Sequence, residues 1–280
     1  MDARRLYLRL QAELGGAEAY LTGRRADGQT GSLPPKPAAS PPALPQEPPS
    51  PPAAPPPAPA APAPIRPSAD WQKNLPPVPG PGLTVSSAVP GLLEASNAWE
   101  TLEAISAAVR DCRKCFLCQG RTQTVPGEGN PAARLLCVGE GPGETEDRTG
   151  RPFVGKAGEL LTSILAAIDL PRETVFIANV VKCRPPQNRK PTPDEMASCL
   201  PYLRQQIQLI RPRVILALGA TAAEALLGAK SSLGDLRNKV HRFDGIPLIV
   251  TYHPAALLRN PNWKKPTWDD VRIARQLLDD

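Results

Sequence analysis

The sequence RLLCVGEGPGETED, residues 134–147, joins an apolar run directly to a glycine-rich loop. A short apolar run bounded by turn residues is typical of a strand that is buried on both faces. The pattern recurs, and apolar runs alternate with segments of helical periodicity along the chain. Strands are expected at 134–139, 175–181, 213–219, 240–243 and 247–252, and helices at 155–170, 192–210, 221–227 and 267–278.

The alternation of strands and helices predicts a parallel sheet covered by helices on both faces. We therefore expect an α/β protein, a three-layer α/β/α sandwich. Ligands of such folds bind at the carboxyl ends of the strands. The glycine-rich loop follows the first strand, Asn179 lies near the end of the second, and His253 follows the last. These groups are expected to converge on one edge of the sheet.

Three patterns at helix starts refine this prediction. Asn97 with Glu100 has the spacing of a capping box and predicts a helix that leads to the first cysteines. Thr192, followed by a proline, is expected to cap the 192–210 helix. Thr267 with Asp270 forms a second capping-box pattern and is expected to open the last helix.

Composition divides the chain into three parts. Of its 37 prolines, 22 fall between Pro34 and Pro90, and such a Pro/Ala-rich stretch buries too little apolar surface to fold. We expect residues 31–94 to form a disordered linker and residues 95–280 a single globular domain. Residues 1–30 carry leucines at helical spacing, which indicates either a marginal helix or an amphipathic segment that binds an unidentified protein partner.

Charge and cysteine content limit the function classes. The formal net charge is +6, and the part from residue 91 onward has 25 Lys/Arg against 21 Asp/Glu. This modest excess is compatible with DNA binding without demonstrating it. The chain has six cysteines, no apolar run of 18 residues and no signal-peptide core. We expect a cytoplasmic monomer without membrane contact that uses cysteines as metal ligands.

Four cysteines form a candidate ligand set. They are a C-x-x-C pair and two single residues: Cys112, Cys115, Cys183 and Cys199. Four thiolates suit a tetrahedral zinc ion or an iron–sulfur cluster, and spacing alone does not separate the two. Cys118 is close enough to the pair to compete as a ligand, whereas Cys137 lies in the first strand and is expected to be a small buried hydrophobe.

The loop Gly139–Gly143 has three glycines directly after a strand, which lets a backbone approach a ligand closely. Its spacing is neither the dinucleotide fingerprint nor a P-loop, and a plain tight turn is an equal alternative.

Asn179 interrupts an apolar strand, where an unsatisfied amide costs about 1–3 kcal/mol. The amide either bonds a neighbouring loop or binds an amide-like edge of a ligand.

Phe153 lies on a loop without periodicity, so it either stacks on a planar ligand or packs in a satellite core. His253 precedes a proline that ends the last strand, and its expected convergence with Asn179 favours a catalytic role over a structural one. The second histidine, His241, is expected at the surface.

Four stretches together resemble the family 4 uracil-DNA glycosylases, the iron–sulfur type. They are GEGPGETED at 139–147, TGRPFVG at 149–155, NVVKCRPP at 179–186 and HPAALL at 253–258. The resemblance covers about residues 100–280 and makes 95–280 the glycosylase domain. It implies a four-stranded parallel sheet, a [4Fe–4S] cluster on Cys112, Cys115, Cys183 and Cys199, and hydrolysis of the N-glycosidic bond of uracil in DNA after base flipping. The product DNA carries an abasic site, and Cys118 and Cys137 are left out of the ligand set.

The resemblance also implies roles for single residues. Phe153 would stack on uracil, and Asn179 would pair with its O4 and N3 edge. His253 would donate to uracil O2, with loop amides near Gly139 and Gly141 assisting. Glu140 and Glu146 are both candidates for the carboxylate that positions water, and their division of labour stays open.

The segment after His253 resembles the loop that wedges into duplex DNA. Leu257, Leu258 and Arg259 belong to it, and Lys264 and Lys265 would contact phosphates. Two alternatives stay open. One is a metal-containing module that binds DNA without catalysis, and the other is a glycosylase with a different base preference.

Overall fold

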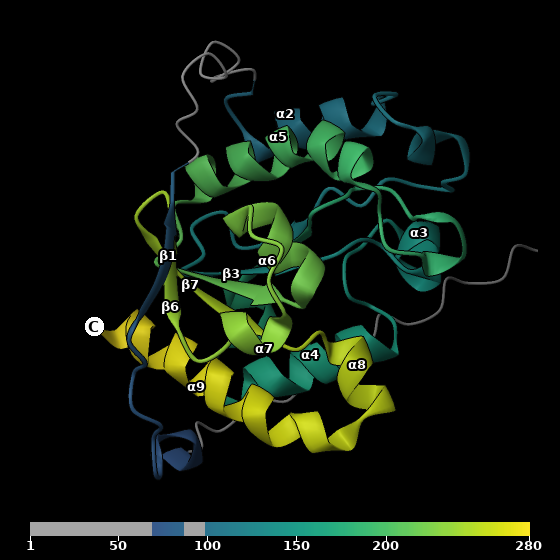
Figure 1. The fold of residues 1–280 in the computed structure, drawn as a ribbon. Coiled ribbons are helices and arrows are strands. Elements are labelled where there is room, and N and C mark those ends of the chain that lie inside the picture. The colour runs from purple at the N-terminus through teal and green to yellow at the C-terminus, as the bar shows by residue number, and fades with distance from the viewer. Residues whose placement is uncertain (1–68, 87–98) are drawn as a thin grey trace, which may run out of the picture. The chain divides into compact units, whose positions relative to one another are not determined.

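The computed structural model describes residues 69–86 and 99–280. The segment expected at residues 1–30 lies outside the described residues. The described part contains a seven-stranded sheet with strand order β1-β6-β7-β5-β3-β4-β2 (Figure 1). The strands are β1 (Pro81–Val85), β2 (Glu128–Gly129), β3 (Leu135–Gly139), β4 (Phe176–Asn179), β5 (Val214–Leu218), β6 (Val240–Phe243) and β7 (Ile246–Thr251).

The sheet confirms the α/β class but is larger than expected. Its four central strands, β7, β5, β3 and β4, are parallel neighbours, and every residue of β3, β4 and β5 is buried. The expected four-stranded parallel sheet describes only this centre. At one side β2 pairs antiparallel with β4, and at the other β6 pairs antiparallel with β7. The short Asp244-Gly245 turn explains the second case, because parallel neighbours need a long crossover.

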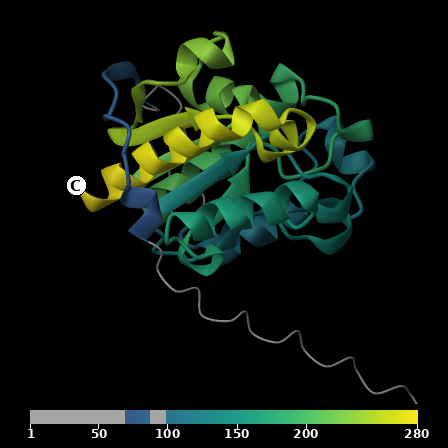
Figure 2. The ribbon, with the colours of Figure 1, turned by 90° about the horizontal axis from the view of Figure 1, so that it is seen from below.

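Helices cover both faces of the sheet. They are α2 (Leu102–Arg110), α3 (Glu144–Thr149), α4 (Lys156–Ala167), α5 (Pro193–Ile210), α6 (Ala220–Leu227), α7 (Leu233–Leu236), α8 (Pro254–Arg259) and α9 (Lys264–Asp279). One core joins α2, α5 and α6 to the sheet, and a second joins α4 and α9 to the opposite face (Figures 1 and 2). Successive residues of β3 alternate between these cores, as the period of two in a strand requires: Leu136 is in the first and Leu135 in the second. No helix among the described residues is long and apolar enough to cross a membrane.

Helix starts agree with the sequence patterns in one case out of three. Thr192 caps α5 as expected, with Pro193 in the first turn and a complete capping box with Glu195. The cap of α2 is Thr101, whose hydroxyl accepts the N–H of Ala104, and Asn97 lies outside the described residues. α9 begins at Lys264, one turn before the expected cap, because a short helical turn at Pro261–Trp263 runs directly into it.

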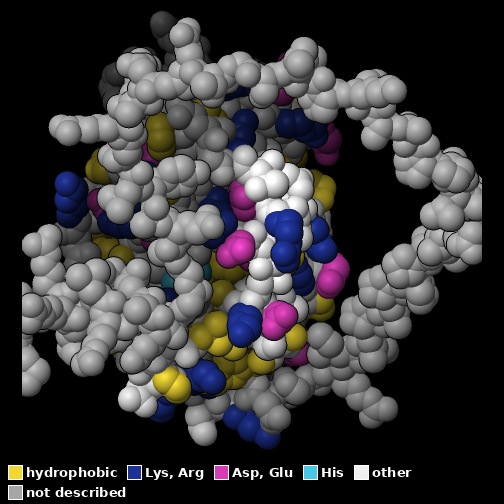
Figure 3. All heavy atoms as spheres, turned by 90° about the vertical axis from the view of Figure 1, so that its right-hand side faces the viewer, with side chains coloured by type: hydrophobic (Ala, Val, Ile, Leu, Met, Phe, Trp, Pro, Cys, Tyr) yellow, Lys and Arg dark blue, Asp and Glu magenta, His cyan; other side chains and the backbone are white. Residues whose placement is uncertain are grey.

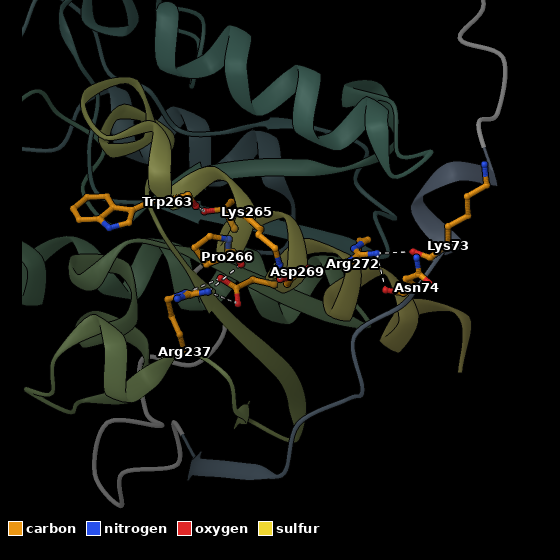
Figure 4. A network of polar contacts seen from close by, with 10 residues as sticks. Lys73, Asn74, Arg237, Trp263, Lys265, Pro266, Asp269 and Arg272 are labelled. Atoms are coloured by element: carbon orange, nitrogen blue, oxygen red, sulfur yellow. Dashed lines mark hydrogen bonds and ion pairs between the residues drawn. The ribbon is translucent and has the colours of Figure 1, made fainter.

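Residues 69–86 belong to the folded unit, which corrects the expected linker over 31–94. β1 pairs in parallel with β6 at the edge of the sheet. Trp71 is buried, and its indole N–H donates to a carboxylate oxygen of Asp169 at 2.9 Å. Arg272 of α9 donates to the carbonyl oxygens of Lys73 and Asn74 (Figure 4). Trp71 and strand β1 thus attach this proline-rich segment to the globular domain.

The packing of β1 against β6 buries His241, which was expected at the surface. Its Nδ1 accepts the backbone N–H of Leu83 at 3.0 Å, and its Nε2 lies 2.7 Å from the carbonyl oxygen of Leu236. A Cβ on Gly82 would come within 2.5 Å of the imidazole. β1 therefore packs against this ring only because a glycine faces it.

Candidate active site

A pocket of about 430 Å³ lies at the carboxyl ends of the parallel strands. Loops after β3, β4, β5 and β7 contribute to it, as the fold class predicts. Seven of the expected site residues line it: Glu140, Gly141, Glu146, Phe153, Asn179, His253 and Arg259. Groups separated by more than 100 residues in the chain thus converge on one edge of the sheet.

The floor of the pocket depends on Gly139, the last residue of β3. A Cβ at this position would lie 2.4 Å from Oδ1 of Asn179 and 2.5 Å from the ring of Phe153. Only glycine lets both side chains approach the strand this closely. Gly139 therefore supports the expected site from below rather than lining it.

Phe153 is held in an unusual backbone conformation. Its φ is 50°, a left-handed value that costs roughly 1 kcal/mol or more for a side-chain-bearing residue. Arg172 donates to its carbonyl oxygen at 2.9 Å, and Gly158 approaches so closely that a Cβ there would overlap this carbonyl. The ring is buried, with its centroid 5.4 Å from that of the His253 ring. The strained loop thus presents a fixed aromatic wall to the pocket.

Asn179 has an unpaired acceptor. Its side chain is 1% exposed, and Oδ1 is one of three buried polar side-chain atoms in the described residues without a hydrogen-bond partner. Buried polar atoms are nearly always paired, because an unpaired one costs about 1–3 kcal/mol. An orphaned oxygen in a pocket wall indicates a ligand that donates a hydrogen bond to it.

His253 has a defined tautomer. It is the N-cap of α8, and its Nδ1 accepts the backbone N–H of Ala255 at 3.1 Å. Burial lowers the pKa of this imidazole to about 4, the charge of Arg259 adds to the lowering, and the charge of Glu146 opposes it. The ring is therefore neutral near pH 7. Since Nδ1 is an acceptor, the proton lies on Nε2.

The two candidate carboxylates are held differently. Oε1 of Glu146 accepts the backbone N–H groups of Val154 and Gly155, each at 2.9 Å, so this side chain anchors the loop of Phe153. Oε2 of Glu140 accepts the hydroxyl of Thr221 at 2.5 Å. The negative charge of Glu146 opposes the lowering of the His253 pKa.

Other pocket residues were missed by sequence reasoning. Thr221 fixes Glu140 from the start of α6, and a Gly-Ala-Thr sequence after a strand was its only signal. Pro185, Asn188 and Arg189 also line the pocket. They lie in a loop after β4 whose position depends on contacts remote in sequence.

The two leucines after His253 face opposite ways, which corrects the expectation that both contact DNA. Leu257 is 1% exposed and packs inside, whereas Leu258 is 49% exposed. Arg259 lines the pocket. Lys and Arg side chains lie beside apolar ones on the face that contains α3 and α8 (Figure 3).

A stack of side chains supports α8. The Trp263 ring stacks on Tyr252, with centroids 4.7 Å apart and planes at 5°, and the guanidinium of Arg237 lies 4.6 Å from the Tyr252 centroid. Arg237 donates two hydrogen bonds to the buried carboxylate of Asp270 and one to the carbonyl oxygen of Pro266 (Figure 4). In that view Trp263 points outward. The stack joins Tyr252, which lies shortly before α8, to Trp263, which lies shortly after it.

The expected ligand cysteines line one small cavity between α2 and α5. Cys118 lines it too, together with Cys112, Cys115, Cys183 and Cys199. Arg121 donates to the sulfur of Cys183 at 3.1 Å, and the backbone N–H of Lys182 donates to that of Cys199 at 3.2 Å. Across the described residues, no three His, Cys, Asp or Glu side chains converge on the position of a single ion.

Cys137 is separate from this cavity. It lies in β3 and is fully buried, as expected from its place in an apolar run. Burial raises the pKa of its thiol to about 12. It therefore stays protonated and inert near pH 7.

Comparison with known proteins agrees with this geometry. Residues 126–274 match the family model of the uracil DNA glycosylase superfamily. A type-4 uracil-DNA glycosylase of Thermotoga maritima is 52% identical over 183 residues, which is 64% of this chain and 95% of that protein. The type-4 enzyme of Sulfurisphaera tokodaii is 47% identical over 187 residues, 64% of this chain and 85% of that protein. A type-5 enzyme of Thermus thermophilus is 37% identical over 149 residues, 46% of this chain and 68% of that protein. The chain therefore belongs to the type-4 uracil-DNA glycosylases.

Proposed function

We propose that this protein hydrolyses the N-glycosidic bond of deoxyuridine in DNA, releasing uracil and leaving an abasic site. The observation that carries the proposal is the orphaned Oδ1 of Asn179 in a pocket that also holds Phe153 and a neutral His253. The relatives' names give the same activity. A base inside a duplex cannot reach this pocket, so the nucleotide must flip out at a cost of about a few kcal/mol.

A direct assay tests the activity. Purified protein is expected to produce alkali-labile breaks at uracil in an oligonucleotide and none in the matching thymine oligonucleotide. If uracil DNA stays intact with protein that contains its metal group, the enzymatic proposal fails. The remaining candidate would then be a non-catalytic module that binds DNA, and retention of the oligonucleotide on the protein would identify it.

Base selection rests on the amide of Asn179. Oδ1 would accept N3–H of uracil and Nδ2 would donate to O4, which satisfies the orphaned oxygen. Cytosine presents an acceptor at N3 and a donor at N4, so both contacts become repulsive. The ring of Phe153 would stack on the flipped base.

Asn179→Ala is expected to lower kcat/KM for uracil excision by roughly 5- to 150-fold, because a pair of base contacts is worth about 1–3 kcal/mol of discrimination. The ratio of uracil to cytosine excision should fall together with it. Single-turnover assays on matched oligonucleotides measure both. Asn130→Ala is the control, since Asn130 only caps a turn near β2. An unchanged uracil-to-cytosine ratio would contradict the assignment.

The bond breaks with charge separation, which the site can stabilise at both ends. Nε2–H of His253 would donate to uracil O2, where negative charge develops, and the backbone N–H of Gly141 would assist. Oε2 of Glu146 is not engaged by the Phe153 loop, so it would hold the attacking water and offset the cationic sugar. We assign the water to Glu146 rather than Glu140, because Glu146 is the carboxylate that influences His253.

Duplex entry depends on Leu258, which we propose fills the space vacated by the flipped nucleotide. The Trp263–Tyr252–Arg237 stack would hold α8, which carries Leu258, in place when Leu258 is pressed against the base stack of the duplex. Arg259, Lys264 and Lys265 would contact phosphates, which makes binding sensitive to salt.

Trp263→Ala is expected to lower kcat/KM on double-stranded uracil DNA about 2- to 10-fold, since an aromatic pair contributes about 0.5–1.5 kcal/mol beyond its buried area. Activity on single-stranded DNA should change less, because no stacked duplex has to be opened. Steady-state assays on the two substrates measure the difference. Trp263→Phe keeps a ring on Tyr252 and should behave like the wild type. Equal losses on both substrates would argue against a role in wedging.

We propose that Cys112, Cys115, Cys183 and Cys199 hold a [4Fe–4S] cluster. The four thiols line one cavity, and the type-4 relatives share the family that the sequence resemblance links to this cluster. N–H donors on the sulfurs of Cys183 and Cys199 would stabilise their thiolate charge. Hydrolysis needs no electron transfer, so the cluster would be structural. We also propose that the protein works as a monomer in the cytoplasm, where thiols stay reduced.

A further inference from the structure

A second groove lies beside the proposed uracil pocket. It measures about 520 Å³ and is lined by Phe116, Leu117, Gln119, Gly120 and Arg184–Gln187. Pro185 lines both the groove and the pocket, and Asn188 lines the pocket from the same turn. The turn 185–188 is therefore a ridge between two neighbouring depressions.

Phe116 is an unusual surface residue. It is 62% exposed, the most exposed large hydrophobic side chain of the described residues, whereas its neighbour Leu117 is 2% exposed and anchors the same short helical turn, Phe116–Gln119. The turn begins directly after Cys115 and contains Cys118, so it is part of the cysteine segment. The backbone that carries the ring is thus fixed by the buried leucine and the thiol cavity, and the ring faces the groove instead of a core.

The ridge is strained. Gln187 and Asn188 both have left-handed φ values, 54° and 55°, and each costs about 1–3 kcal/mol. Arg184 donates to Oδ1 of Asn188 at 2.8 Å, and the N–H of Asn188 bonds the carbonyl oxygen of Pro185 at 3.0 Å. Such strain persists where surrounding contacts impose it, and it concentrates at ligand clamps.

The charge around the groove suits a phosphodiester backbone. Arg184 lines it, and its side chain is 25% exposed. Glu144 is the acidic partner of Arg184, at 3.5 Å and 76% exposed, so it competes only weakly for the guanidinium. An aromatic ring beside cationic side chains is the arrangement that binds single-stranded nucleic acid by stacking and phosphate contact.

We propose that this groove binds the nucleotide next to the target uridine when the DNA is single-stranded, with its base stacked on Phe116 and its backbone crossing the 185–188 ridge beside Arg184. An unpaired base offers its face to an aromatic ring, whereas the same base in a duplex is already stacked and paired. The inference rests on the proposed glycosylase function and adds a subsite that favours single-stranded substrate.

The test compares Phe116→Leu and Phe116→Ala with wild type on single- and double-stranded uracil oligonucleotides. Both variants should raise KM on single-stranded DNA about tenfold, with kcat and the double-stranded KM nearly unchanged. Phe116→Trp should restore the single-stranded KM. A wild-type enzyme that excises uracil from duplex DNA establishes the function independently of this result.

Substrate length gives a second readout. Two single-stranded oligonucleotides are compared, one without nucleotides on the 5′ side of the uridine and one without nucleotides on its 3′ side. Because the groove lies on one side of the pocket, Phe116→Leu should change the KM of only one of them. Val78→Ala is the control, because Val78 is an exposed apolar residue in the 69–86 segment and does not line the groove. Iron content shows whether Phe116→Ala has disturbed the cysteine cavity. If it has, Phe116→Leu still tests the proposal, because it keeps an apolar side chain at position 116. An unchanged single-stranded KM in Phe116→Leu overturns the proposal and leaves a protein-binding role for the ring.

Discussion

His253→Ala is expected to lower kcat for uracil excision by about 10²–10³-fold with little change in KM, the usual effect of removing one donor to a developing oxyanion. The reason lies in the tautomer. Nδ1 accepts the N–H of Ala255, so the pocket side of the ring carries the Nε2 proton without a positive charge. That donor matters most when charge appears on uracil O2 in the transition state.

Single-turnover rates measure the loss, and competition with unreactive DNA separates binding from chemistry. His253→Gln keeps an N–H donor and should recover part of the rate. The rate of wild type should not fall through protonation of His253 until the pH approaches about 4, the pKa of the buried ring. A variant that keeps more than a tenth of the wild-type rate would contradict the assigned role.

The same lowered pKa predicts a change in stability. The ordinary pKa of histidine is 6.5 and the folded-state value is about 4, so between these values the unfolded chain binds one more proton than the folded one. The stability that depends on neutral His253 is therefore complete above about pH 6.5 and falls as the pH drops toward 4. Urea denaturation should show a shallower decline between pH 7 and pH 5 for His253→Ala than for wild type.

Cys199→Ser is expected to abolish bound iron and to lower the unfolding midpoint by roughly 8–16 °C. Loss of a metal group is among the few single changes that cost about 4 kcal/mol or more, and a domain of this size loses about 2–4 °C per kcal/mol. Cys199 is on α5 and Cys112 follows α2, so the group would tie together two helices on one face of the sheet. Serine leaves a buried hydroxyl that cannot replace the thiolate.

Iron and sulfide analysis, visible absorbance and thermal unfolding measure this result. Two matched variants test the ligand set. Cys118→Ser should keep its iron although Cys118 lines the same cavity, and Cys137→Ala should keep it because β3 holds that thiol elsewhere. A colourless protein with one equivalent of zinc would rule out the cluster, and iron loss in Cys118→Ser would change the assigned ligands.

The expected active-site residues could be found from the sequence because they follow strands. A fully buried parallel strand is a continuous apolar run, so β3, β4 and β5 are visible as such in the chain. The residues at their carboxyl ends then meet at one edge, whatever the helices between them do. Asn179 and His253 come together for this reason alone.

Other parts of the site depend on side-chain direction and on long-range contact. Leu257 and Leu258 are identical in sequence terms, and only the packing of α8 decides that one is buried and the other exposed. The contact of Glu140 with Thr221 spans 81 positions, and neither residue type requires the other. The groove of Phe116 exists because the cysteine segment and the 185–188 turn lie side by side in space.

Periodicity, glycine positions and cysteine spacing by themselves determined the α/β class, the central strands and the edge of the sheet where the site lies. They did so because local propensity and burial pattern act over a few residues. Only the tertiary structure decided that β1 completes the sheet and that His241 is buried against it. It also decided which side chains line the pocket, among them Thr221 and Arg189. Those outcomes depend on free energies of contacts between segments far apart in the chain, for which the local sequence carries no signal.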